Sequence, residues 1–323
     1  KGFGVEIEFL RPIGKSQSTI CRKIQAHVVF QAQQIECKRE SWNKRTVPYW
    51  KCVTDSSVKA GNWNPNHTGD NELVSPILFG QKGKAQLKAV LQVLREEGCE
   101  VNATCGIHVH HDITETMLAG IRIAKRVLKN LIGLVVKYEH VIYNLMPASR
   151  LTREYSQPAR KFISHKKETI SRLVNRDLNR HYRYQMNAVS TDNRKAQIQS
   201  GRYSGLNLQN IYTRGSVEFR YMQGSLNFSK VWSWVVMTQA IVTTAERVNS
   251  VSFTKFSNDV VESFWNFKRA IGFVGGHEVC ADTAFSNSES RKKLDTFTTR
   301  ECISRKRING YGYYNYPLVS NTT

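Results

Sequence analysis

Acidic residues are scarce in this chain. Only 26 aspartates and glutamates stand against 47 lysines and arginines in 323 residues, so the formal net charge at pH 7 is +21. A strongly positive protein attracts anions and raises their concentration near its surface. We therefore expect an acidic partner, which could be a nucleotide, a polyanionic substrate, nucleic acid or an anionic membrane surface.

The sequence also lacks paired cysteine motifs and long apolar runs. Its seven cysteines are odd in number and include no Cys-x-x-Cys pair. This pattern argues against a disulfide framework and a structural zinc, and it favours a reducing, cytoplasmic location. The longest apolar stretches, at 131–136 and 231–245, are short or interrupted by Ser, Thr and Gln. Neither predicts a membrane-spanning helix, so we expect no membrane partner.

Three short strand-like stretches, widely separated in the chain, carry ligand-type side chains at alternate positions. They read GVEIEF at 4–9, GIHVHHD at 106–112 and SVEFRY at 216–221. Because a strand alternates its side chains with period 2, each stretch puts these side chains on one face and mainly apolar residues on the other. The residues on the predicted polar faces are Glu6, Glu8, His108, His110, Asp112, Glu218 and Arg220.

These three faces together predict a metal-and-phosphate site. Hard divalent cations prefer oxygen ligands, and the planar guanidinium of Arg220 suits a phosphate. Each stretch alone has an ordinary explanation: Glu-x-Glu is typical of a solvated edge strand, His-x-His of a polar patch, and Glu-x-Arg of a weak ion pair. The coincidence of three such faces, carrying almost only ligand-type side chains, favours the site.

The remaining pattern predicts the fold class. Further strands are expected at 47–54, 71–76 and 204–212, and helices over 14–45, from Leu87 to a stop at Gly98, over 116–145, over 228–248 and over 259–271. Strands and helices do not alternate as regular βαβ units. We therefore expect an α+β domain with a mainly antiparallel sheet, one face open as the active site and the other covered by helices.

Six motifs in a set order suggest a family. They are GVEIEF at 4–9, Asp55-x-Ser57, ELVSP at 72–76, CGIHVH at 105–110, PASR at 147–150 and VEFR at 217–220. The series resembles the amidoligase family, which is related in fold to glutamine synthetase and glutamate–cysteine ligase. The resemblance extends over residues 2–245. It implies a glutamine-synthetase-like fold and an ATP- and Mg²⁺-dependent (or Mn²⁺-dependent) ligase that joins a carboxylate to an amine through an acyl phosphate.

The resemblance also implies roles for individual residues. The positions that match metal ligands are Glu6, Glu8, Glu72, His108 and Glu218. His110 matches the second histidine of the pair, which would touch metal or phosphate. Arg220 matches a catalytic, phosphate-stabilising arginine, and Arg150 an arginine that binds ATP. Asp55 would bind or deprotonate the incoming amine.

Two other functions use the same residues. His108 and His110 could hold Zn²⁺ together with Glu72 and make a zinc hydrolase, since imidazoles prefer zinc to magnesium. Against this, four glutamates suit a hard ion better. The acidic face could also bind metals for phosphodiester chemistry in a protein that binds or processes nucleic acid, a less favoured alternative.

We expect a catalytic domain over residues 1–250, with a basic, mostly helical insertion at 150–202, and an extension over 251–323 that packs on the same domain. The resemblance assigns no role to the insertion or to the extension. Residues 150–214 contain fourteen lysines and arginines against four acidic residues. This segment could be a solvated helical face, a site for ATP and an acidic substrate, or a nucleic-acid interface. We expect the carboxylate substrate to be acidic beyond its reacting group, so that neutralising Lys166, Lys167, Arg172 and Arg176 raises its KM.

Overall fold

The computed structural model describes residues 1–62, 64–147, 149–152, 156–159, 203–211, 214–251 and 260–272, with isolated positions between 170 and 178. These residues form two compact units. The first contains residues 1–110 and 222–235, and the second contains the described parts of 111–221 and 236–282. Strands β5 (Gly106–Asp112) and β7 (Ser216–Gln223) and helix α9 (Phe228–Arg247) each continue from one unit into the other.

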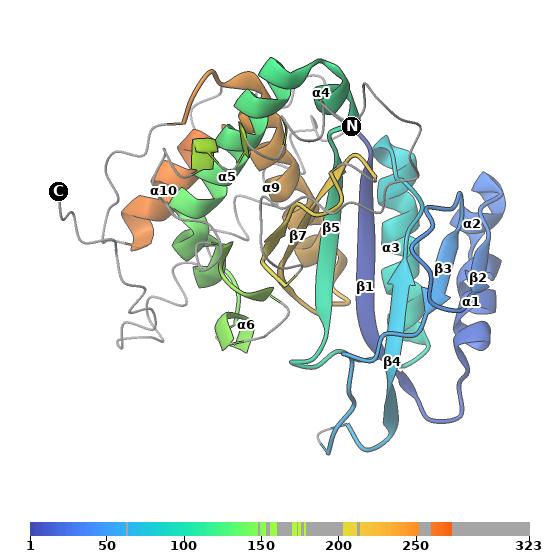
Figure 1. Cartoon of the computed structure of the whole chain (residues 1–323). Coiled ribbons are helices and arrows are strands. Elements are labelled where there is room, and N and C mark those ends of the chain that lie inside the picture. The colour runs from blue at the N-terminus through green and yellow to red at the C-terminus, as the bar shows by residue number, and fades with distance from the viewer. Residues whose placement is uncertain are drawn as a thin grey trace. The chain divides into compact units, whose positions relative to one another are not determined.

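The first unit is built on a mainly antiparallel sheet (Figure 1). Its strands are β1 (Phe3–Pro12), β2 (Cys37–Arg39), β3 (Trp50–Val53), β4 (His67–Val74) and β5, in the order β2-β3-β4-β1-β5. Strand β4 runs antiparallel to both β1 and β3, whereas β2 runs parallel to β3. The predicted α+β class with a mainly antiparallel sheet is confirmed. The predicted helix over 14–45 is wrong at its end, where β2 forms the sheet edge.

Three helices belong to this unit: α1 (Gln17–Ala26), α2 (Val28–Gln33) and α3 (Gly80–Glu96). Helix α1 contacts β2 and β3, and the three helices contact one another. Trp50 of β3 is buried, and its indole Nε1 donates to Gln86 Oε1 of α3 at 3.0 Å. Helix α3 ends as the sequence predicts, because Gly98 adopts a left-handed φ of 73°.

Strand register decides which side chains face these helices. Ile7 lies opposite Leu73, and Leu73 lies opposite Cys52 on the next strand. Paired residues point to the same side of a sheet, so these three fully buried side chains share one face. Glu6, Glu8 and Glu72 must then share the other, as the alternation in the sequence predicts.

The second unit contains mostly helices. They are α4 (Thr114–Leu118), α5 (Ile121–Asn144), α6 (Ser149–Thr152), the later part of α9, and α10 (Val260–Ala270), and α5 contacts both α4 and α10. The ring centroids of Tyr138 on α5 and Phe267 on α10 are 5.3 Å apart. Strand β6 (Leu206–Asn207) pairs antiparallel with β7. The strand predicted over 204–212 is therefore only two residues long.

The long helix predicted over 116–145 is two helices. Gly120 separates α4 from α5 with a φ of 100°, a conformation that residues with a Cβ rarely adopt and that a continuous helix does not contain. Most of the predicted insertion at 150–202, including Lys166, Lys167 and Arg176, lies outside the described residues, as does most of 251–323. The predicted boundary at residue 250 stays a prediction. Among the helices that are described, none is both long and apolar enough to cross a bilayer.

A buried carboxylate ties α5 to β7 in the second unit. Glu139 is fully buried, and its Oε1 accepts hydrogen bonds from the Tyr221 hydroxyl at 2.7 Å and from the Ala159 amide at 2.5 Å. Tyr143, one turn further along α5, stacks edge-on against Tyr221 and donates its hydroxyl proton to the Ser156 carbonyl. A buried acid with two donors satisfies the rule that buried polar groups need partners.

Replacing Tyr221 by Phe should destabilise the protein more than replacing Tyr143 by Phe. A hydrogen bond to a charged acceptor contributes about 1.5–3 kcal/mol, whereas one to a neutral carbonyl contributes roughly 0.5–1.5 kcal/mol. The two tyrosines are equally buried and touch each other, so each is a matched control for the other. Denaturant unfolding measures both values. Equal losses would show that the bond of Tyr221 to Glu139 contributes no more than a bond to a neutral carbonyl.

Candidate active site

A glutamate on β1 is the centre of the predicted site in the first unit. Glu6 Oε2 lies 2.9 Å from His108 Nδ1, and Glu6 Oε1 lies 3.1 Å from His110 Nε2, both on β5. The two histidines therefore share the face of Glu6, as their spacing predicts. Each carboxylate oxygen of Glu6 has an imidazole partner.

The histidines determine the charge of this carboxyl group. Burial by itself would raise the pKa of Glu6, but the charge of His110 and hydrogen bonds with His108 and His110 outweigh it. The pKa of Glu6 is consequently held well below its ordinary value. Glu6 is therefore an ionised carboxylate at neutral pH, which is the form that a metal ligand requires.

The neighbouring Glu8 is more deeply buried and has a backbone partner. The Gly106 amide at the start of β5 donates to Glu8 Oε2 at 2.5 Å, and His108 Nε2 lies 3.5 Å from Glu8 Oε1. His108 thus lies between two carboxylates, with one ring nitrogen toward each. A doubly protonated ring can donate to both, whereas a neutral ring leaves one nitrogen able to bind a cation.

Strand pairing brings two further carboxylates to this face. Glu8 lies directly opposite Glu72 across β1 and β4, and both are buried. Glu72 also lies opposite Val53, two residues before Asp55. Oxygen atoms of Glu8, Asp55 and Glu72 lie within 4.8 Å of one another, and so do ligand atoms of Glu6, Glu72 and His108. Glu72 belongs to both groups, so the structure offers two adjoining sets of cation ligands.

The opposed glutamates are unfavourable for folding. Like charges directly across an antiparallel pair destabilise a sheet, and burial increases the repulsion because the surroundings screen it less. A divalent cation between them would reverse the sign of this interaction. The carboxylate cluster therefore fits Mg²⁺ or Mn²⁺, which take oxygen ligands.

Asp55 lies in a turn beside the cluster, and its predicted role toward the amine stays a prediction. Its Oδ1 accepts a hydrogen bond from the Ser57 amide at 2.8 Å, which is the ordinary turn made by Asp-x-Ser. The same carboxyl group also contributes an oxygen to the set with Glu8 and Glu72. The turn thus fixes the orientation of Asp55 beside the cluster.

The predicted Glu218 and Arg220 belong to the second unit, on β7. Arg220 Nη1 lies 2.5 Å from Glu218 Oε1, and Asn207 Nδ2 on β6 donates to Glu218 Oε2 at 2.7 Å. The ion pair considered from the sequence is present. It is largely buried, so it is less screened than a surface pair. The metal role of Glu218 stays a prediction.

Two other predicted residues have backbone partners in this unit. Arg150 is buried, with Nε donating to the Tyr221 carbonyl at 3.0 Å and Nη2 to the Arg220 carbonyl at 2.6 Å. These bonds hold the segment that carries Arg220, and the role of Arg150 in ATP binding stays a prediction. Asp112 Oδ1 accepts from the Thr114 amide at 2.8 Å, so this residue stabilises the start of α4.

Three contributors were not foreseen from the sequence. The Gly106 amide and Asn207 each donate to a glutamate of the predicted faces, and Lys51 lies on the same side of the sheet as Glu6. Lys51 lies opposite Val74, which lies opposite Glu6, and its ammonium donates to the Asn43 and Arg45 carbonyls. The Cys-Gly at the start of the histidine strand could have indicated the Gly106 amide, because a glycine offers only its backbone groups for hydrogen bonds. Nothing in the sequence pairs Asn207 with Glu218.

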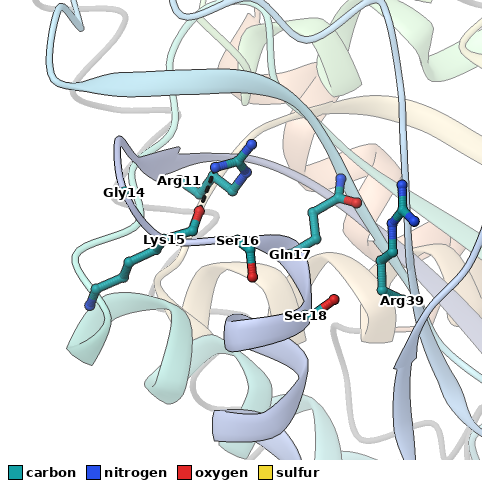
Figure 2. Close-up of a pocket in the computed structure, with 7 residues that line it drawn as sticks. All are labelled: Arg11, Gly14, Lys15, Ser16, Gln17, Ser18 and Arg39. Atoms are coloured by element: carbon teal, nitrogen blue, oxygen red, sulfur yellow. Dashed lines mark hydrogen bonds between the residues drawn. The ribbon is translucent and has the colours of Figure 1, made fainter.

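A basic hollow of about 450 Å³ lies at the start of α1 in the first unit (Figure 2). Its charged lining residues are Arg11, Lys15 and Arg39. The Arg11 guanidinium bonds the Lys15 carbonyl, and in Figure 2 the Lys15 ammonium extends away from the other labelled side chains. This ammonium forms an ion pair with Glu97 at 2.8 Å. The hollow is thus less positive than its composition suggests, and we assign it no ligand.

Comparison with known proteins shows a family and includes a weak likeness to a solved structure. The model of the family described as "Putative amidoligase enzyme" matches residues 1–242. No curated protein matches the chain. A solved bifunctional glutathione synthetase from Pasteurella multocida is 11% identical, with 95% of this chain and 48% of the synthetase covered and a TM-score of 0.43. The chain thus spans about half the length of that synthetase.

Replacing Glu72 by Gln should stabilise the metal-free protein and remove its response to metal. The substitution keeps the shape of the side chain but ends the repulsion with Glu8, so we expect the melting temperature to rise by a few degrees, which is about 1 kcal/mol. Thermal unfolding with and without Mn²⁺ tests this. Wild-type protein should gain stability with Mn²⁺, and Glu96→Gln on the exposed side of α3 should behave like wild type. A Glu72→Gln variant that still responds to Mn²⁺ would contradict the metal-binding cluster.

Proposed function

Since this chain belongs to the amidoligase family, we propose that it is an ATP-dependent ligase that joins a carboxylate to an amine through an acyl phosphate, with Mg²⁺ or Mn²⁺ bound at the carboxylate cluster. The glutamine-synthetase-like form of its sheet is part of this proposal. A mainly antiparallel sheet with helices on one face and ligand-type side chains on the other supports it.

The observation that carries the proposal is the convergence of four carboxylates on the face that bears Glu6. Glu6, Glu8 and Glu72 lie beside His108, and Asp55 lies beside Glu8 and Glu72. In each of the two overlapping sets the ligand atoms lie within 4.8 Å of one another. ATP brings several negative charges next to a substrate carboxylate, and these repel unless cations neutralise them. Mg²⁺ needs only a few protein oxygens besides phosphate and water. When bound, the metal would neutralise phosphate charge and orient the phosphates for transfer.

The chain's own residues then have defined tasks. In the first step the substrate carboxylate attacks the γ-phosphorus of ATP, the bond to the bridging oxygen breaks, and ADP leaves. In the second step the amine attacks the acyl carbon, phosphate leaves, and the amine loses a proton. Asp55 is the proposed acceptor of this proton, since its carboxylate is fixed by the Ser57 amide beside the cluster. No nucleophilic side chain is needed.

Arg220 is the proposed stabiliser of the transferring phosphoryl group. Glu218 contacts Nη1 and Asn207 holds the other oxygen of Glu218, so the guanidinium is oriented before substrate binds. Arg150 supports the same strand through the Arg220 and Tyr221 carbonyls. Preorganised donors of this kind stabilise charge in the transition state without a cost of reorientation.

A zinc hydrolase is the second candidate, because Glu6, Glu72 and His108 also form a three-ligand set that zinc accepts. The distinguishing experiment offers ATP, a panel of amino acids and dicarboxylic acids, and hydroxylamine as a surrogate amine. The ligase should form hydroxamates only with ATP and with Mg²⁺ or Mn²⁺. One tightly bound zinc per chain in protein purified without added metal, with no ATP-dependent product, would favour the hydrolase.

Replacing Arg220 by Lys should reduce kcat strongly and leave the KM for ATP nearly unchanged. Lysine keeps the charge but loses the planar fork that binds two oxygens, and removing one transition-state donor reduces kcat by about 10²–10³-fold. Steady-state kinetics of hydroxamate formation measures both constants. Arg95→Lys, an exposed change on α3, is the control and should retain wild-type kinetics. A raised KM with normal kcat would instead assign Arg220 to ground-state binding of ATP.

A further inference from the structure

Three cysteines lie together between α1 and the edge of the sheet in the first unit. Cys21 is on α1, Cys37 on β2 and Cys52 on β3, and all three are buried free thiols. Cys37 lies opposite Trp50, and Cys52 is two residues further along the same strand, so Cys37 and Cys52 share one face of the sheet. Helix α1 contacts both of these strands and lies beside them in Figure 1.

Hydrogen bonds hold Cys21 and Cys37 against each other. The Cys37 amide donates to Gln25 Oε1 at 3.3 Å, and Gln25 is one turn after Cys21 on α1. The thiols of Cys37 and Cys52 both donate to the sulfur of Cys21. Cys21 is therefore the central thiol of the three, with one thiol neighbour on each of two strands.

This arrangement suits a bond between two sulfurs better than a bound metal ion. A thiolate metal site needs all of its sulfurs close to one another. Among the described residues, the groups whose ligand atoms all lie within 4.8 Å of one another consist of carboxylates and imidazoles and include no cysteine. A disulfide needs only two sulfurs, and Cys21 is in hydrogen-bond contact with a thiol on each of two strands.

The three thiols differ in reactivity and in freedom to move. Hydrogen bonds from Cys37 and Cys52 lower the pKa of the Cys21 thiol, whereas the bond to Cys21 and burial raise the pKa of each neighbour. The thiolate is the form that attacks an oxidant, so Cys21 reacts first. Its more adaptable partner is Cys37, because β2 is a three-residue strand at the sheet edge and β3 is paired on both sides. Local opening at an edge also admits a small oxidant at less cost than opening within the sheet.

We propose that Cys21 and Cys37 are a site of reversible oxidation by a peroxide, which joins α1 to β2 through a disulfide. The Cys21 thiolate attacks one oxygen of hydrogen peroxide, the O–O bond breaks, and the departing hydroxide takes up a proton to become water. The Cys37 thiol then attacks the sulfenic sulfur, the S–S bond forms, and its proton leaves with the hydroxyl group as a second water. Two thiols thus lose two electrons and two protons. The site lies on the helix-covered face and does not depend on the ligase proposed for the other face.

The test treats the reduced full chain with hydrogen peroxide, alkylates the remaining thiols and maps the disulfides by mass spectrometry. Trypsin cleaves after arginine and lysine, so positions 21, 37 and 52 fall in three different peptides. The first product should link the Cys21 and Cys37 peptides, and dithiothreitol should separate them. Cys99 is the internal control: it is similarly buried, but burial raises the pKa of its thiol to about 12, so it should stay reduced. No disulfide, or a first product that links another pair, would overturn the proposal.

Two serine variants separate the partners of Cys21. Cys37→Ser should leave Cys21 as a sulfenic acid that dimedone traps, whereas Cys52→Ser, which removes the other neighbour, should form the disulfide as wild type does. A disulfide between Cys21 and Cys52 that forms as fast in Cys37→Ser would contradict the choice of Cys37. The peptide map of the wild-type chain needs no substitution, so it decides the proposal even if a variant fails to fold.

Thermal unfolding gives a second readout. The disulfide would close a loop over the 15 residues between Cys21 and Cys37, which restricts the unfolded chain. Oxidation should therefore raise the melting temperature of the wild-type protein by about 5 °C and leave that of Cys37→Ser unchanged. A lower melting temperature after oxidation would show that the bond strains the fold and would contradict the site.

Discussion

The register between β1 and β4 is the constraint on which the site in the first unit depends. It places Ile7 opposite Leu73 on the helix-covered face and Glu8 opposite Glu72 on the other. A shift of one residue would move every carboxylate of β1 under the helices and every apolar side chain into the open. Burial of the apolar face against α1 and its neighbours therefore enforces the register, and the register in turn brings the glutamates together. Hydrophobic packing on one side of the sheet positions charge on the other.

Glu6 and Glu8 have partners that offset the repulsion between the glutamates of this face. Glu6 is balanced by two imidazoles, and Glu8 receives a backbone amide as well as a distant His108 nitrogen. Glu72 lies directly opposite Glu8. A sheet selected for stability alone would not put like charges at a buried cross-strand pair. A buried pair of this kind is consistent with a face that is completed by cations.

The lysines and arginines that give the chain its positive net charge differ in their local surroundings. In the hollow at the start of α1, Arg11 donates a hydrogen bond to the Lys15 carbonyl. The Lys15 ammonium forms an ion pair with Glu97. On α5 the same residue types line a hollow with no acid in its described wall, near the end of a helix that disfavours them. Arg150 is different again, since buried carbonyls take its hydrogen bonds. The net charge of the chain is therefore divided among cations in different local surroundings.

The sequence by itself determined the features that follow from repeating patterns of neighbouring residues. Alternation with period 2 fixed that Glu6 shares a face with Glu8, and His108 with His110, and the ordered motifs indicated the family over most of the chain. Helix positions such as α3 and its stop at Gly98 followed from apolar spacing and from the freedom of glycine. The ends of helices and strands were less certain. Gly120 breaks a helix that the apolar pattern would continue, because the pattern of apolar residues carries no information about its backbone φ.

Only the tertiary structure decided which of these faces meet and what satisfies each side chain. The pairing of Glu8 with Glu72 joins residues 64 positions apart, and Asp55 lies beside both although it is 47 positions from Glu8 and 17 from Glu72. The Gly106 amide beside Glu8 and the Asn207 amide beside Glu218 are of the same kind. Such contacts depend on strand order and on burial across the sheet, which are properties of the whole packed unit. A local pattern can name the ligands of a site, but only packing sets the distances between them.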